Sequence, residues 1–404
     1  MKLKTVILRN FRCYHEEIRI SFRDDITAFI GKNDAGKSTI LEALEIFFNG
    51  DTIKMEQNDA YVESDCSDVT IGCVFTDLPT ELVLDDTSTT TLEAEYLLNE
   101  EGDLELHKIW DCTKKNPKGE VVAICQHPSV EGADGLLQLA NNQLKTRLKE
   151  RDIDPSSVDQ RVNPQLRSAI WKSFEHDDLQ LSTREIPLNK ADAKRVWEQL
   201  EKILPSFALF QADRPSRDDD DEVQDPMKIA VAEAIRNVEP QLDEIKEQVQ
   251  EEAAKVAQAT LDKLQEMDKQ LATDLSPTFR EEPKWANLFK LTLIADKGIP
   301  LNKRGSGVRR LVLLNFFRAQ AEKKYIDDEE TSGIIYAIEE PETSQHPANQ
   351  QLLMEALMAL SEREDCQVIL STHVPGLAGL LPVQSLRYIE TEPQGVRFIS
   401  EGTD

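Results

Sequence analysis

The sequence predicts an α/β protein built around a parallel sheet. Short apolar runs alternate with helical patterns after Pro283. A glycine-rich turn joins an apolar run at 26–30 to a helical pattern at 38–48, and β-branched or alternating runs crowd the first 110 residues. The alternation is typical of a parallel sheet with helices on its faces, whereas the crowded short runs indicate an additional antiparallel β subdomain.

Length and composition limit the class of protein. The chain has 404 residues, of which 40% are hydrophobic, and this length allows roughly two or three structural units. No run approaches the ~18 apolar residues of a membrane span, and the first residues lack the apolar stretch of a secretion signal. The six cysteines are scattered without a C-x-x-C pair, which favours reduced thiols. We therefore expect a cytoplasmic protein with no membrane partner.

The formal net charge of −28 bears on nucleic-acid binding. Such a chain repels DNA at long range, so contact with DNA would need a local basic patch or a channel lined by several copies. Two candidate patches are Lys190 to Arg195, which also fits ordinary solvated surface, and Lys303-Arg304 with Arg309-Arg310.

The N-terminal part contains the predicted antiparallel strands. Five short runs have strand character: Lys4 to Leu8, Glu17 to Phe22, Val69 to Phe75, Thr91 to Leu98 and Asp103 to Trp110. From Gly132 to about Leu204 the pattern is mostly helical, and Phe207 to Phe210 is a further strand candidate. The acidic run from Asp218 to Glu222 predicts a solvent-exposed loop.

Met227 to Asp274 is the clearest helical block. It lacks aromatic residues and glycine, and Pro240 interrupts it, which predicts two helices. Its apolar positions recur at mostly helical spacing: Ile245, Val249, Val256, Leu261, Leu264 and Met267. We expect a helical arm that packs on a partner helix; the alternative is a pair of surface helices on the same core.

After Pro283 strands and helices alternate. Strands are predicted at Leu288 to Ala295, Ile334 to Ile338, Val368 to Ser371, Leu386 to Ile389 and Val396 to Ile399. Helices are predicted at Val308 to Lys324 and Ala348 to Ser361. This order predicts the α/β sheet itself.

Gly31 to Ser38 matches a phosphate-binding loop, G-x-x-x-x-G-K-[ST]. The glycines let backbone N–H groups turn toward phosphate oxygens without Cβ clashes. Lys37 brings a positive charge to the β- and γ-phosphates, and Ser38 offers a hydroxyl to Mg²⁺. An accidental match is the alternative, but the flanking strand and helix supply the context that an anion site requires.

Three carboxylates follow the predicted strand at 334–338, namely Glu339, Glu340 and Glu342. In an open α/β sheet, ligands bind beyond the carboxyl ends of the strands. One carboxylate there can hold Mg²⁺, and the next can orient and deprotonate an attacking water. Because like charges this close repel each other, a nearby cation is expected. A strand that runs into an acidic turn is the alternative.

Two further features are ambiguous by themselves. His373 follows the predicted strand at 368–371, where it is either a structural residue or a γ-phosphate contact. Arg304 to Arg310 opens a predicted helix with two glycines and Ser306, which fits an ordinary capped helix or a second anion site. A second phosphate cradle in one chain makes sense if it serves the nucleotide held by another copy.

With these motifs in place, the chain resembles the ABC-type ATPases of the RecF/SMC kind, and most closely the ATPase module of OLD-family (overcoming lysogenization defect) proteins. The motifs occur in that family's order: "NFR" at Asn10-Phe11-Arg12, Walker A at Gly31 to Ser38, the signature at Arg304 to Arg310, Walker B at Ile334 to Glu340, the D-loop at Ser344 to Pro347 and the switch histidine His373. The resemblance implies an ABC-type P-loop ATPase head with an antiparallel β subdomain and an inserted helical arm.

The resemblance also implies roles for single residues. Lys37, Glu340 and His373 are expected to be catalytic, with Glu340 activating water and His373 sensing the γ-phosphate. The cofactors are ATP and Mg²⁺, and the metal is expected on Ser38 and Glu339. The expected nucleotide contacts are Arg12, Asn33, Gly36, Lys37, Ser38, Thr39, Ser306 and Gly307.

The chain departs from the family pattern in several places. Glu339 stands where most ABC proteins have aspartate, the signature lacks its leading Leu-Ser and following Gln, and no Q-loop glutamine is evident. Only 31 residues follow His373, too few for the TOPRIM nuclease domain of OLD-family nucleases. Any nuclease activity is therefore expected from a partner chain or from sequence outside this one.

We expect three segments: ATPase lobe I over 1–215, a helical arm or dimerisation insertion over 216–285, and ATPase lobe II over 286–404. The resemblance favours a slow, partner-regulated ATPase, forming a homodimer or higher homo-oligomer, whose ATP-gated closure controls an effector, expected to be a nuclease in anti-phage defence. The alternatives are a RecF-like DNA-repair ATPase that binds DNA directly, the ATPase part of a longer OLD-type endonuclease, and a non-hydrolysing switch.

Overall fold

The computed structural model describes residues 1–50, 54–85, 88–174, 179–211, 238–267, 333–343, 347–391 and 396–403, with isolated positions between 231 and 319. The chain divides into two compact units, one formed by Met1–Arg214 with Leu314–Asp404 and the other by Pro215–Leu313. Two six-stranded sheets, one largely parallel and one antiparallel, confirm the mixed α/β class predicted from the sequence.

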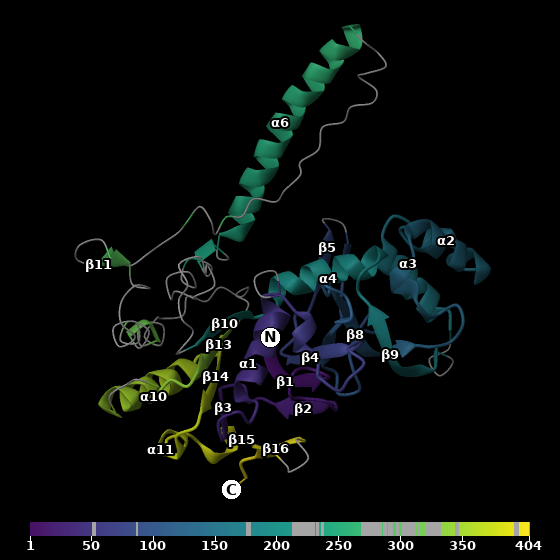
Figure 1. Ribbon diagram of the computed structural model, residues 1–404. Coiled ribbons are helices and arrows are strands. Elements are labelled where there is room, and N and C mark those ends of the chain that lie inside the picture. The colour runs from purple at the N-terminus through teal and green to yellow at the C-terminus, as the bar shows by residue number, and fades with distance from the viewer. Residues whose placement is uncertain are drawn as a thin grey trace. The chain divides into compact units, whose positions relative to one another are not determined.

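The largely parallel sheet contains the strands that precede the predicted phosphate-binding loop, the predicted carboxylates and His373 (Figure 1). Its spatial order is β10 (Ser206–Phe210), β13 (Ile334–Glu339), β14 (Cys366–Thr372), β3 (Ile26–Gly31), β15 (Leu386–Thr391) and β16 (Arg397–Glu401). Neighbouring strands run parallel except for β15 and β16, which form an antiparallel hairpin. Every residue of β14 is buried, as expected for a central strand of a parallel sheet. An N-terminal strand thus lies between two C-terminal ones.

The second sheet is antiparallel throughout. Its spatial order is β2 (Ile18–Ser21), β1 (Lys2–Arg9), β4 (Val69–Thr76), β7 (Leu104–Trp110), β8 (Gly119–Pro128) and β9 (Leu181–Pro187), and a small hairpin of β5 (Leu82–Asp85) and β6 (Ser88–Thr90) stands apart from it. Four of the five strands predicted in the first 110 residues are confirmed. The strand predicted over Thr91 to Leu98 is wrong, because this segment forms turns and buries Glu95 in an ion pair with Arg167.

Helix α1 (Lys37–Phe48) is held by both sheets. Phe48 stacks on Phe207 of β10 with ring centroids 5.4 Å apart, and it meets Phe75 of β4 edge-on at 6.1 Å. A helix that is apolar on nearly all sides is typical of a buried position. These contacts hold the C-terminal end of α1 against a strand of each sheet.

Among the described residues of the region predicted to be mostly helical, the structure has α2 (Asn141–Glu150), α3 (Asn163–Lys172) and α4 (Ala191–Ile203), with the 3₁₀ turns η2 (Leu136–Gln138) and η3 (Pro155–Ser157). A further 3₁₀ turn, η1 (Gln57–Asp59), lies earlier in the chain. Helices α2 and α3 pack around Trp171 in a hydrophobic cluster separate from the main core. The prediction is confirmed except for β9, and the strand candidate at Phe207 to Phe210 is confirmed by β10.

The C-terminal alternation is confirmed where it is described. The remaining elements are α10 (Pro347–Ser361), α11 (Pro375–Ala378) and η7 (Val383–Ser385). Of the helix predicted over Val308 to Lys324, Val312, Asn315 to Phe317 and Ala319 are helical, and the rest lies outside the described residues. Of the strand predicted over Leu288 to Ala295, Phe289 lies in a bend and Ile294–Ala295 forms β11.

The second unit contains α6 (Glu239–Met267) and a short pairing of β11 with β12 (Ile299–Pro300). Pro240 is the second residue of α6, a position where its missing N–H costs no helical hydrogen bond. Ile245, Val249 and Val256 of the predicted apolar face are 50%, 62% and 68% exposed. The acidic run from Asp218 to Glu222 lies outside the described residues.

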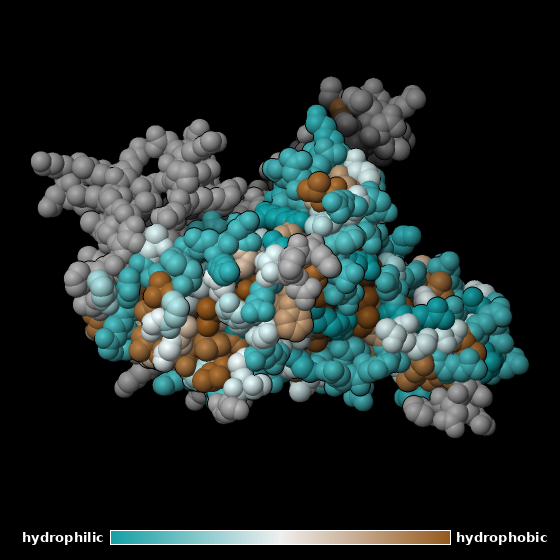
Figure 2. Space-filling view, turned by 60° about the horizontal axis from the view of Figure 1, so that its bottom comes forward, coloured by the Kyte–Doolittle hydropathy of each residue, from teal (hydrophilic) through white to brown (hydrophobic). Residues whose placement is uncertain are grey.

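The described surface is polar over much of its area. Hydrophilic residues dominate the face seen in Figure 2, with smaller apolar groups among them. Within the described residues, no helix combines the length and apolarity needed to cross a membrane. All six cysteines are free thiols, as predicted from their scattered positions.

Candidate nucleotide-binding site

The loop between β3 and α1 has the backbone that a phosphate cradle requires. Gly36 precedes α1 with φ +107°, and a Cβ atom there would lie 2.8 Å from the Tyr14 hydroxyl oxygen. A Cβ on Gly31 would lie 2.7 Å from the carbonyl oxygen of Ile389. Both positions therefore exclude larger residues. Asn33 is exposed in this loop, whereas Ser38 and Thr39 are half-buried on the first turn of α1.

Lys37 bends back over the loop. Its Nζ donates to the carbonyl oxygens of Gly31 and Lys32, at 3.0 and 2.9 Å. Burial lowers the pKa of the Lys37 ammonium below its usual value, and the carboxylates of Glu340, Glu342 and Glu339, at the end of β13, oppose this shift. The ammonium is thus held where the loop would cradle an anion.

The ends of three neighbouring strands bring the predicted residues together. In the parallel register Glu339 pairs with Ser371 of β14, and Thr372 pairs with Ile30 of β3. Because parallel strands end at the same edge, the loop after β3, the carboxylates after β13 and His373 after β14 meet at that edge. Segments more than 300 residues apart in the sequence thereby form one site.

Glu339 lies beside Ser38, as the predicted metal site requires. The Ser38 hydroxyl hydrogen-bonds the Glu339 carboxylate. Burial raises the pKa of Glu339, and the nearby negative charges of Glu42 and Glu340 add to this rise. A cation bound here would remove the repulsion.

Mg²⁺ fits this donor set. In proteins Mg²⁺ is usually held by one or two carboxylates together with substrate phosphates and water, rather than by a cage of side chains. Ser38 and Glu339 supply such a partial set.

Glu340 and His373 face each other across the strand ends. The Nδ1 atom of His373 lies 3.3 Å from Oε1 of Glu340, and Oε2 of Glu340 accepts from the Thr343 hydroxyl at 3.3 Å. The backbone of Glu340 has φ +42°, and its N–H donates to the Ser371 carbonyl oxygen at 3.0 Å. The Glu340 side chain is 31% exposed, so water can reach it.

Arg12 is engaged by carboxylates. Its Nε donates to Oδ1 of Asp59 at 2.8 Å, and its Nη1 pairs with Glu42 of α1. The guanidinium also lies over the Phe11 ring, 5.1 Å from the centroid. Arg12 therefore lies beside α1. Its guanidinium is already held by Asp59 and Glu42, so it would be in a fixed position for a contact with the nucleotide.

Gln211 is a site residue that the sequence analysis missed. It directly follows β10, donates from Nε2 to Oε1 of Glu42 at 3.4 Å, and hydrogen-bonds Glu339. A glutamine one residue after the predicted strand at Phe207 to Phe210 was the available signal. It could not be interpreted without knowing that β10 lies next to β13.

The remaining predicted residues are not placed. Ser306 and Gly307, and with them the whole signature from Arg304 to Arg310, lie outside the described residues. Of the proposed D-loop, only Pro347, the first residue of α10, is described.

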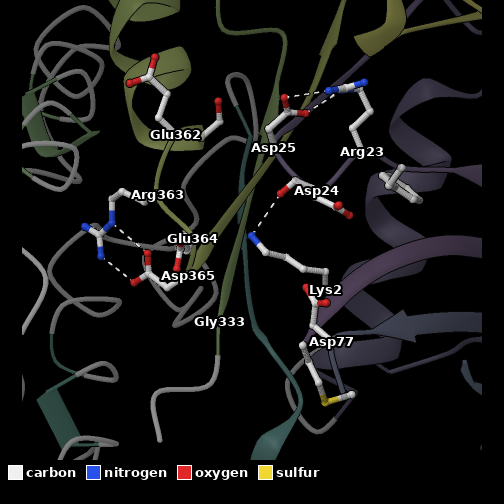
Figure 3. Close-up of a pocket in the computed structure, with 13 residues that line it drawn as sticks. Lys2, Arg23, Asp24, Asp25, Asp77, Gly333, Glu362, Arg363, Glu364 and Asp365 are labelled. Carbon is white, nitrogen blue, oxygen red and sulfur yellow. Dashed lines mark hydrogen bonds and ion pairs between the residues drawn. The ribbon is translucent and has the colours of Figure 1, made fainter. Parts of the chain in front are cut away.

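A cavity of about 700 Å³ lies at the opposite edge of the same sheet (Figure 3). Gly333, Asp365 and Asp25, each just before one of the three strands, contribute to its lining. Two ion pairs lie in its lining, Arg363 with Asp365 at 2.7 Å and Arg23 with Asp25 at 2.8 Å. The phosphate-binding loop from Gly31 to Ser38 lies at the other, carboxyl edge of the sheet, and the nucleotide site is assigned there.

Comparison with known families agrees with this assignment. The family model described as AAA ATPase domain (AAA_15) matches residues 1–378. The chain belongs to the AAA_15 family. The coarse prediction of an ATPase domain is thereby confirmed, while the roles of single site residues stay predictions.

The match of this AAA_15 protein to an individual curated protein covers far fewer residues than its match to the family model. The chain is 48% identical to the DNA replication and repair protein RecF of Lactococcus lactis subsp. lactis (strain IL1403) over 44 residues. These 44 residues make up 11% of this chain and only 12% of RecF.

Among solved structures, the SMC head domain from Thermotoga maritima is 12% identical with a TM-score of 0.41 over the whole of both chains. The Smc head domain with an extended coiled coil bound to the C-terminal domain of ScpA, derived from Pyrococcus furiosus, is 11% identical with a TM-score of 0.45 over 99% of this chain and 96% of that one.

Proposed function

We propose that this AAA_15 protein binds ATP and hydrolyses it to ADP and phosphate at the carboxyl edge of β3, β14 and β13. The observation that carries this proposal is the convergence of Lys37, Glu339, Glu340 and His373 at that edge, beside a loop that only glycine can form at Gly36. A purely structural P-loop would not need a partly exposed carboxylate, Glu340, at the same sheet edge.

Each residue would have a defined task. The loop N–H groups and Lys37 hold the triphosphate, and Ser38 with Glu339 would hold Mg²⁺, which neutralises phosphate charge. Glu340 accepts a proton from the attacking water, for which its partial exposure is suited. His373, already directed at Glu340, would contact the γ-phosphate side, and Gln211, which hydrogen-bonds Glu339, would support the metal side.

The finer proposal is that ATP closes two copies over a shared pocket. In it, Ser306 and Gly307 of one copy complete the site of the other, the 216–285 segment serves as arm or dimerisation insertion between lobes 1–215 and 286–404, and closure controls a partner effector. ATP would favour the closed state because only that state makes every contact with it. The resemblance to OLD-family ATPase modules supports a nuclease effector, anti-phage defence and slow, partner-regulated turnover.

A RecF-like role in DNA repair is the second candidate. The short but close similarity to RecF favours it, whereas the net charge of −28 opposes strong intrinsic DNA binding. Affinity for DNA measured across a salt series, with and without ATP, separates the two. Tight ATP-dependent binding by the chain alone would favour the repair role.

Phosphate release by the purified chain tests the core proposal. The wild type should release phosphate from ATP only with Mg²⁺, and Lys37→Ala should abolish nucleotide binding and turnover, because the main cation of the cradle is lost. As a matched control, Lys194→Ala removes a surface lysine paired with Glu198 and should leave both unchanged. Turnover by Lys37→Ala at the wild-type rate would refute this site.

A further inference from the structure

Glu342 is the most deeply buried carboxylate in this part of the site, and no catalytic task was assigned to it. Its side chain is 3% exposed, compared with 31% for Glu340 two residues earlier. Burying a carboxylate is costly unless its charge is used by a partner. The position of Glu342 therefore calls for a specific partner inside the site.

One oxygen of Glu342 lies close to three polar groups at the end of β14. Oε1 accepts from the Thr372 hydroxyl at 2.7 Å and from the backbone N–H of His373 at 3.2 Å. The same oxygen lies 3.3 Å from Nδ1 of His373. Glu342 thus holds the backbone before the imidazole and the imidazole itself.

The other oxygen, Oε2, is buried and has no hydrogen-bond partner among the described residues. If Glu342 served only to accept hydrogen bonds from the end of β14, both of its oxygens would be expected to have donors, or a neutral acceptor would be expected in its place. The negative charge of Glu342 also acts on Lys37, where it opposes the lowering of the lysine pKa that burial causes.

His373 Nδ1 has two carboxylates within the same distance. It lies 3.3 Å from Oε1 of Glu340 and 3.3 Å from Oε1 of Glu342. One N–H cannot serve both acceptors fully. Glu342 is fixed by Thr372 and the backbone, whereas Glu340 is 31% exposed and accepts from the Thr343 hydroxyl through its other oxygen, so water can reach it.

We propose that Glu342 is a positioning residue that holds the His373 imidazole by its Nδ1 side, leaving Nε2 on the opposite side of the ring and Glu340 free to act as base. The proposal rests on the ATPase function argued above. Without Glu342, the Nδ1 side of His373 would interact with Glu340 alone. Glu340 would then be engaged by the imidazole instead of the attacking water, and the ring would be less well oriented.

A double-mutant cycle in ATP hydrolysis tests the proposal. Glu342→Gln keeps the size and an acceptor oxygen but removes the charge, so kcat should fall roughly 10- to 100-fold, as is typical when a supporting partner of a catalytic group is lost. Affinity for a fluorescent ATP analogue should change much less. In a His373→Ala background, Glu342→Gln should cause no further loss, because its effect passes through the ring. Independent, multiplying losses would overturn the proposal.

Nitrogen NMR of the His373 ring in nucleotide-free protein provides a readout that does not depend on turnover. Glu342→Gln should shift the Nδ1 signal, whereas Glu362→Gln, the same change at the exposed residue directly after α10, should not. If Glu342→Gln fails to fold, Thr372→Val, which removes one donor to Glu342, should shift the same signal. An unchanged ring signal would overturn the proposal, and absence of phosphate release by the wild type would instead refute the proposed ATPase.

Discussion

At the scale of single residues, Gly36 shows how backbone geometry limits the site. Its φ of +107° is one that side-chain-bearing residues rarely adopt, and the Tyr14 hydroxyl and the Cys13 sulfur fill the space where a Cβ would stand. Tyr14 also donates its hydroxyl to the Gly36 carbonyl oxygen at 3.2 Å. The loop is therefore built by the residues behind it as well as by its own glycines.

Gly36→Ala should abolish tight ATP binding. The new Cβ forces either the loop or Tyr14 to move, and the backbone strain costs about 1–3 kcal/mol. Gly102→Ala is the matched control, because Gly102 has φ +81° with nothing within 4 Å of its Cβ position. Calorimetric titration should show ATP binding by Gly102→Ala but not by Gly36→Ala. Equal ATP affinity in the two variants would show that the loop does not form the site.

Residues in local motifs could be predicted from the sequence, whereas residues defined by tertiary neighbours could not. Lys37 and Ser38 belong to one continuous loop, and Glu339 and Glu340 to one strand end, so spacing alone identifies them. Gln211 becomes part of the site only because β10 lies beside β13. The anchoring of His373 by Glu342 likewise depends on the register between β13 and β14.

At the scale of elements, the strand prediction failed where a buried side-chain interaction outweighed the strand propensity of the segment. Thr91 to Leu98 has strand-like residues but forms turns that bring Glu95 against Arg167 of α3. Strand β9 was missed because it is an edge strand with mostly exposed side chains, so it lacks a clear hydrophobic alternation. Elements buried on both faces, such as β14, were predicted well because apolar runs define them.

Arg167→Met should destabilise the protein strongly. Arg167 is fully buried, binds Glu95 through Nε and Nη2 at 2.7 Å each, and pairs with Asp192 of α4 at 2.5 Å. Removing it leaves the buried Glu95 without this cation and Asp192 with the more distant Arg195, 3.9 Å away, at a cost of about 3–5 kcal/mol. Urea unfolding should show this loss. Arg161→Met, at an exposed pair with Asp159, should leave the midpoint unchanged; a similarly small effect for Arg167→Met would contradict the account.

At the scale of the whole molecule, the site depends on long-range chain order. The N-terminal strand β3 lies between the C-terminal strands β14 and β15, so neither end of the chain can form the site alone. The sequence predicted the alternation and the class, but strand order follows from packing between distant segments. The proposed second half of the pocket, Ser306 and Gly307, belongs to residues that the structure does not describe.

The most direct test of the account is the state of Glu340→Gln in the presence of ATP and Mg²⁺. This variant keeps the shape of Glu340 but cannot take a proton from water, so it should bind ATP and retain it unhydrolysed. Light scattering combined with analysis of the bound nucleotide should then show an ATP-loaded dimer. Lys37→Ala should show neither nucleotide nor an ATP-dependent change in mass. Glu340→Gln that turns over ATP at the wild-type rate, or that holds ATP as a lone protomer, would contradict the central claim.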